Sequence, residues 1–232
     1  MERPPVDTAL PLAEQVYQKL RHAIVGCEFE PGVRLRVEEL TRLLGVSSSP
    51  VREALNRLAE QGIVRTLENR GFRVASVSPE GVMDLVRVRL LVECDALRDA
   101  IANGSDEWEA SVVAASHALA LVERRLGDQP RVLDNEWSAR HRAFHLSLYA
   151  GCTSPILRDM VGVLFDRAEH YRRWAARNRQ APRRKHDEHQ RLMTATLQRD
   201  APKALELLHR HIHRTGELVC AVLNGESPQW RQ

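Results

Sequence analysis

The sequence predicts a mainly α-helical protein, in which an N-terminal winged helix-turn-helix precedes an antiparallel bundle of six to seven helices. Two short helix patterns meet at a tight turn within residues 37–60, and a strand–turn–strand pattern follows them directly. From Ser78 onward, six helix patterns are joined by short turns, which is typical of an antiparallel bundle. We therefore expect domains at residues 1–76 and 77–225, followed by a flexible tail at 226–232.

The helix-turn-helix is predicted by its apolar spacing and its helix ends. The first helix pattern runs into Gly45, a typical helix stop, and consists of Val37, Leu40, Leu43 and Leu44. Ser49 and Pro50 predict an N-cap and a proline at the first position of the second helix. Residues 64–67 and 72–75 then predict a hairpin, the wing, around residues 68–71. An αα-hairpin used only for packing is the alternative.

The outer face of the second helix carries the side chains suited to DNA. Arg52 and Asn56 lie four residues apart and are therefore neighbours on a helix. Arginine and asparagine have the forked geometry that matches guanine and adenine edges in the major groove. The net charge of residues 1–76 is only +1, so a positive patch must come from local arrangement. Its candidate members are Arg34, Arg36, Arg42, Arg52, Arg57, Arg70 and Arg73.

This N-terminal segment resembles the DNA-binding domain of GntR-family bacterial transcription factors. The matching positions are Pro31, Gly32 and Leu35, residues 45–55 (GVSSSPVREAL), Arg57, Leu58, Gly62, and Arg70 with Gly71 at the wing tip. The resemblance implies that the partner is double-stranded operator DNA. The residues expected to contact it are Arg34, Ser47, Ser48, Ser49, Arg52, Asn56, Arg70 and Gly71. Relatives usually have arginine where this chain has Ser48, so one charged contact is lost.

Composition favours a soluble cytoplasmic protein with no membrane partner. No apolar run approaches the roughly 20 residues needed to cross a bilayer, and the N-terminus is too polar for a signal peptide. The four cysteines are scattered without a CxxC pair, which favours buried free thiols over disulfides.

The remaining helices are predicted from caps, prolines and glycines. A cap and proline at Ser78 and Pro79 start the first helix of the second domain, and Asn103 and Gly104 end it. The other helix patterns cover about residues 105–126, 131–150, 154–172 with a basic extension to 184, 184–198 and 200–223.

Histidine placement is the second strong signal in the sequence. Nine of the ten histidines follow residue 100. Helical facing turns four of them toward the core from three helices: His141, His145, His189 and His211. Four neutral imidazoles suffice for a metal site. The alternative is a set of core histidines satisfied by backbone groups or water.

The helical region resembles the FCD-type sensor domain of the FadR branch of the GntR family. The matching positions are Arg89, Leu90, Glu93, Phe144, His145, Gly151, residues 189–192, Asp200, Ala204, His211 and Ile212. The resemblance implies a divalent metal held by an aspartate and three histidines, with a small carboxylate effector beside it. His145, His189 and His211 match the family's histidines, and His141 replaces its aspartate. Four neutral ligands favour zinc, with nickel or copper as alternatives. Alternatively, water takes the place of His141.

Arg89 has two interpretations. It is either a surface arginine paired with Glu93 at i+4 or, as the resemblance implies, the residue that binds the effector carboxylate in a bidentate manner.

Two classes of function remain open. The first is a ligand-responsive transcription factor that binds DNA as a homodimer, with its two domains coupled through the short linker at 75–78. The second is a metal-dependent hydrolase with an accessory N-terminal domain, which needs a general base beside metal-bound water. The sequence has no HExxH motif, and Asp187, Glu188 and Glu206 are expected to fall away from the histidine faces. The sequence therefore favours the transcription factor.

Overall fold

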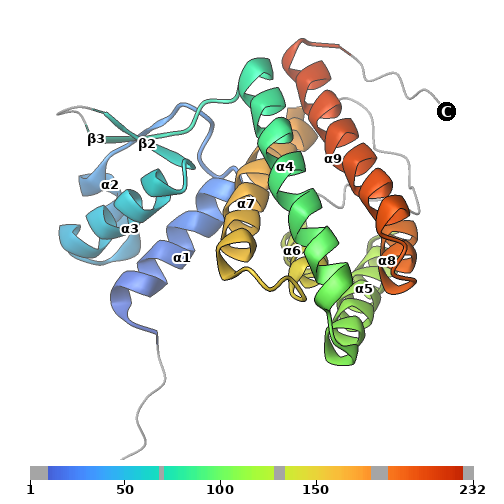
Figure 1. Ribbon diagram of the computed structural model, residues 1–232. Coiled ribbons are helices and arrows are strands. Elements are labelled where there is room, and N and C mark those ends of the chain that lie inside the picture. Colours follow the sequence, from blue (N-terminus) through green and yellow to red (C-terminus); the bar gives the residue numbers. More distant parts are fainter. Residues whose placement is uncertain (1–9, 68–70, 128–133, 179–187, 227–232) are drawn as a thin grey trace, which may run out of the picture. The chain divides into compact units, whose positions relative to one another are not determined.

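The computed structural model describes residues 10–67, 71–127, 134–178 and 188–226, which form nine helices and one three-stranded sheet (Figure 1). Contacts divide the chain into two compact units, Met1–Ser76 and Val77–Gln232. The first contains three helices and the sheet, and the second contains six helices. The predicted fold class, a winged helix-turn-helix followed by a helical domain, is confirmed.

The first unit packs α1 (Leu12–Val25), α2 (Val37–Leu44) and α3 (Ser48–Glu60) around a common apolar core. Its sheet consists of β1 (Arg34–Leu35), β2 (Val64–Leu67) and β3 (Gly71–Val74), antiparallel in the order β1-β3-β2. The sequence did not predict β1, because two residues are too few to show an alternating pattern. Gly45 ends α2 at a φ of 65°, a left-handed conformation that favours glycine.

The start of α3 differs from the prediction. The N-cap is Ser47, not Ser49, and Pro50 is the third residue of the helix. Proline is tolerated there because the first backbone N–H groups of a helix have no partner within it. The second wing strand begins one residue earlier than predicted, at Gly71. The expected wing residues 68–70 lie outside the described residues.

The second unit contains α4 (Pro79–Asn103), α5 (Asp106–Leu126), α6 (Asn135–Tyr149), α7 (Pro155–Asn178), α8 (Glu188–Leu197) and α9 (Ala201–Leu223). Side-chain oxygens of four residues cap helix starts by accepting backbone N–H groups: Ser78, Ser105, Asp134 and Asp200. Each such cap typically contributes about 1 kcal/mol. Apart from Glu226, the expected tail lies outside the described residues.

Close helix packing organises the second unit. Helix α4 packs against both α7 and α9, α5 against α6, and α8 against α9. A Cβ atom on Gly216 of α9 would lie 2.4 Å from Cγ2 of Val86 on α4, so only glycine allows these two helices to approach as they do. All four cysteines are free, and Cys27 and Cys152 are buried. None of the described helices is long and apolar enough to span a bilayer.

Candidate nucleic-acid interface and metal centre

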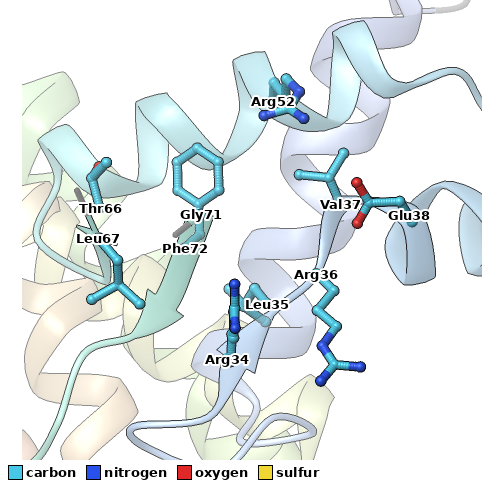
Figure 2. Close-up of a pocket in the computed structure, with 10 residues that line it drawn as sticks. All are labelled: Arg34, Leu35, Arg36, Val37, Glu38, Arg52, Thr66, Leu67, Gly71 and Phe72. Atoms are coloured by element: carbon cyan, nitrogen blue, oxygen red, sulfur yellow. The ribbon is translucent and has the colours of Figure 1, made fainter. Parts of the chain in front are cut away.

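The first candidate site is a groove of about 460 Å³ between α3 and the sheet of the first unit. Figure 2 shows Arg52 on α3 on one side of it and residues of β1 and β3 on the other. Its charged lining residues are Arg34, Arg36, Arg52 and Glu38, so positive charge predominates. Gly71 also lines the groove, and its φ of 90° favours glycine at the wing. This groove can receive a polyanion.

The structure places most of the predicted DNA-contacting residues on the surface. Arg52 and Asn56 are exposed on α3, whereas its inner face is fully buried through Val51, Ala54, Leu55 and Leu58. Ser47, Ser48 and Ser49 are exposed at the start of α3. The groove gathers Arg34, Arg52 and Gly71, but not these serines or Asn56. Arg70 lies outside the described residues.

Arg57, a candidate member of the positive patch, joins two helices of the first unit. Nη1 of Arg57 donates to Oε2 of Glu14 at 2.8 Å, and its guanidinium lies 3.9 Å from the centre of the Tyr17 ring. The hydrogen bond to Glu14 raises the pKa of Arg57. Arg57 therefore fastens α3 to α1 and does not belong to the outer face predicted from the helix pattern.

The second candidate site is the cluster of His141, His145, His189 and His211, which the structure brings together from α6, α8 and α9. One nitrogen of each ring lies within 4.8 Å of those of the other three. The ring centres of His141 and His145 are 4.5 Å apart, and those of His145 and His211 are 5.1 Å apart. All four predicted imidazoles thus converge on one point of the second unit.

The hydrogen bonding of this cluster fits a metal. Nδ1 of His141 and both ring nitrogens of His145 are buried and have no hydrogen-bond partner among the residues described. Buried polar atoms are normally paired, so unpaired ones call for an ion or water. Burial holds the pKa of both His141 and His145 well below the ordinary value for histidine. The charge of Arg172 lowers the pKa of His141 further, and the charge of His211 lowers that of His145. Neutral imidazoles are the form that coordinates a metal.

His211 is held by a second layer of contacts. Its Nδ1 lies 3.0 Å from Oε2 of Glu188, whose Oε1 accepts from Nη1 of Arg214 at 2.7 Å. Nε2 of His211 is thereby left for the cluster, as is common for metal-binding histidines. The expectation that Glu188 falls away from the histidine faces is wrong. Glu188 is the first residue of α8, where a side chain can reach a neighbouring helix outside the helical repeat.

Arg89 is not a surface residue. Its side chain is 7% exposed and forms a two-pronged ion pair with Glu93, with Nε–Oε1 at 2.5 Å and Nη2–Oε2 at 3.2 Å. The hydroxyl of Tyr149 also donates to Glu93, at 2.7 Å. Burial is the largest single influence on the pKa of Arg89 and lowers it, but the charge of Glu93, its hydrogen bonds to Arg89 and the smaller contributions of Tyr149 and Glu169 together raise that pKa overall. The predicted i+4 pair exists, but inside the bundle.

Sequence reasoning missed a second buried arginine beside the cluster. The guanidinium of Arg172 lies 4.9 Å from the centre of the Trp137 ring, and Trp137 stacks on His141 at 4.5 Å. Arg172 also pairs with Glu169, while its Nη1 is buried without a partner in the described part of the chain. The helix pattern gave no signal for this, because Arg172 begins a basic stretch that is typical of a solvated helix end.

Comparisons with known proteins match both units. Residues 12–74 match the model of bacterial regulatory proteins of the gntR family, and residues 84–214 match the FCD domain. The chain is 37% identical over 215 residues to the uncharacterized HTH-type transcriptional regulator BphR of Paraburkholderia xenovorans, covering 93% of this chain and 88% of that protein. It is 38% identical over 200 residues to the HTH-type transcriptional repressor GlaR of Escherichia coli, covering 84% and 90%. Among solved structures, E. coli McbR/YncC shares the fold, with a TM-score of 0.71 and 23% identity over 91% of this chain and 98% of that chain.

Proposed function

The chain belongs to the GntR family of bacterial regulatory proteins, and from this we propose a repressor that binds operator DNA as a homodimer and responds to a small carboxylate. It is a transcriptional regulator whose N-terminal unit has a winged helix-turn-helix. Repression is proposed because GlaR, a relative over most of the chain, is named a repressor. The observation that carries the proposal is the pairing of an arginine-lined groove in one unit with a four-histidine cluster in the other.

The hydrolase alternative requires a free general base near the histidine cluster. Glu188 is the carboxylate that contacts a cluster histidine, but both of its oxygens are engaged, one by His211 and the other by Arg214. Glu93 is likewise held by Arg89 and Tyr149. Glu188 and Glu93 therefore position neighbouring side chains, and neither is free to act as that base.

In the proposed complex, α3 enters the major groove. Arg52 reaches base edges or the adjacent phosphates, and Asn56 lies one turn further along the same face. The exposed serines at positions 47–49 bind the backbone with their hydroxyl groups, and Gly71 brings the wing close to the minor groove.

Replacing Arg52 tests DNA binding. Loss of a bidentate arginine contact typically costs about 1–3 kcal/mol, so Arg52→Ala should weaken binding to a cognate site by roughly 5- to 150-fold. The fold should persist because Arg52 is exposed. The assay is a gel shift on the promoter fragment of the protein's own gene at fixed salt. Arg98→Ala, an exposed arginine on α4, is the control and should bind as the wild type does. Unchanged affinity of the Arg52 variant would refute the assignment.

In the second unit, we propose that His141, His145, His189 and His211 hold a divalent transition metal, with zinc as the first choice and nickel or copper as alternatives. A bound metal ion would supply positive charge that attracts a carboxylate effector. Arg89 and Arg172 are the buried cations that flank the cluster, and both contribute to the low pKa of His145. Arg172 has the buried Nη1 without a partner among the described residues, so it is the better placed of the two to bind an anion.

The homodimer is proposed to form through the helices of the second unit. Leu91 on α4 is 68% exposed, and Ile156 and Met160 on α7 are 72% and 43% exposed. Because α4 and α7 pack against each other, these apolar side chains belong to neighbouring helices. A two-fold axis would also give two recognition helices for two operator half-sites.

Light scattering tests the dimer. The full-length protein at micromolar concentration should have twice the 26.4 kDa mass of the chain. Leu91→Glu should shift it toward the monomer, because a buried charge in an interface is costly. Leu121→Glu, at a leucine on α5 that is 48% exposed, should leave the mass unchanged. A monomeric wild-type protein would contradict the proposal.

A further inference from the structure

Three arginines form a row across the outer face of the wing sheet. Arg34 of β1 is directly opposite Arg73 of β3, and Arg73 is directly opposite Arg65 of β2. All three side chains are exposed, while the other face of the sheet is buried through Leu35, Val64, Phe72 and Val74. The sequence pattern gives no signal for Arg65, because the pairing of β2 with β3 creates the row.

This arrangement works against stability. Like charges directly opposite each other on neighbouring strands are destabilising. In the described part of the chain, neither Arg65 nor Arg73 has an ion-pair or hydrogen-bond partner that would offset the repulsion. Residues 1–76 carry a net charge of only +1, so this face concentrates positive charge that the rest of the unit balances. A partner that supplies negative charge would relieve the repulsion.

The dimensions of the row fit a nucleic-acid backbone. Neighbouring strands lie about 4.8 Å apart, so three arginines on three strands span about 10 Å. One strand of B-DNA carries a phosphate for each ~3.4 Å of helix axis and its backbone winds around that axis, so a row of this length can contact more than one phosphate of a strand. Arg34 also lines the groove that contains Arg52, which makes the row a continuation of the proposed DNA-reading surface.

We propose that Arg34, Arg73 and Arg65 bind the phosphodiester backbone of the DNA that flanks the base pairs read by α3. The proposal rests on the proposed DNA-binding function and extends it to a second, sequence-independent contact. Phosphate contacts fix the position of a protein on the duplex and add salt-dependent affinity without reading sequence.

The test is the double variant Arg65→Gln/Arg73→Gln in the full-length protein, measured by fluorescence anisotropy between 50 and 200 mM salt. The probes are two duplexes of equal length, the promoter fragment of its own gene and a random sequence. Each lost phosphate contact lowers the slope of log affinity against log salt by about 0.9. The dimer loses four such contacts, two in each protomer, so the slope should fall by about 3.6 on both duplexes. The melting temperature should stay the same or rise, because two like charges are removed. Weaker DNA binding without lower stability is a result that a merely structural role would not produce.

A matched control separates this local effect from net charge. Arg140→Gln/Arg210→Gln removes the same two charges from exposed positions of the second unit and should keep the wild-type slope. If the wild type binds both duplexes and the Arg65/Arg73 variant has the same slope, the row is not a DNA contact, although the proposed function stands. If that variant binds DNA normally but loses binding to polyglutamate, the row serves an acidic protein and the proposal is overturned. If the wild type binds neither duplex, the proposed function itself fails.

Discussion

His189→Ala and His211→Ala should each abolish the metal binding that we propose for the second unit. Protein purified without chelator should contain about one divalent metal ion per chain, and each variant less than a tenth of that, measured by mass spectrometry of the metal. Each variant removes one of the four convergent nitrogens. A metal present at 1,000 times its dissociation constant stabilises a fold by about 4 kcal/mol, so the melting temperature should fall by roughly 10 °C.

The same variants separate sensing from DNA binding. Both should bind DNA in the absence of effector as the wild type does, but lose the change in affinity that an effector carboxylate causes. Such coupling is usually about 1–3 kcal/mol, or roughly 5- to 150-fold in affinity. His117→Ala, an exposed histidine on α5, should keep both the metal and the response. A wild-type protein that contains no metal and is unaffected by chelator, together with variants that respond normally, would refute the metal site.

Glu93→Gln should destabilise the second unit by about 3–5 kcal/mol, because it leaves the buried guanidinium of Arg89 without its counter-charge. Glu93 is fully buried and also accepts the Tyr149 hydroxyl. The pKa of that hydroxyl lies well above its ordinary value, first because it is buried and then because of the charge of Glu93. Burial persists in the variant and opposes ionisation of Tyr149, so this hydroxyl is not expected to replace the lost charge. Urea unfolding followed by circular dichroism measures the change.

A double-mutant cycle identifies the cause of that loss. Replacing both partners with methionine removes the orphaned charge, so Arg89→Met/Glu93→Met should be more stable than Glu93→Met alone. Asp95→Asn, two residues further along α4 in an exposed pair with Arg98, is the control and should cost less than about 1 kcal/mol. If the double variant is no more stable than Glu93→Met, shape rather than charge determines the effect.

The sequence predicted those parts of the fold that depend on local chemistry. The caps at Ser78, Ser105 and Asp200 lie where the helix patterns begin, because a capping side chain bonds the backbone within three residues. The four histidines could be assigned to one cluster because helical facing is periodic and three apolar stripes must share one core.

Features that depend on contacts between distant segments could not be predicted. The burial of Arg89 and Arg172 departs from the rule that charged side chains lie on the surface. It depends on α6, whose Tyr149 donates to Glu93, the partner of Arg89, and whose Trp137 ring lies against Arg172. The row of three arginines requires the register of β1 and β2 on β3, which no local pattern specifies. Arg57 was misassigned because its partners, Glu14 and Tyr17, lie about forty residues earlier in the chain.

The close approach of Val86 to Gly216 restricts how α4 and α9 can move relative to each other. Val86 of α4 sits against the bare backbone of α9, five residues along from His211. The two helices cannot slide past each other unless the Val86 side chain first moves away from Gly216. This contact therefore fixes the register of α4 against α9. A displacement of His211 along the axis of α9 would therefore be passed to α4, the helix that the chain enters directly from the winged unit. Gly216 would thus couple the position of the histidine cluster to that of α4.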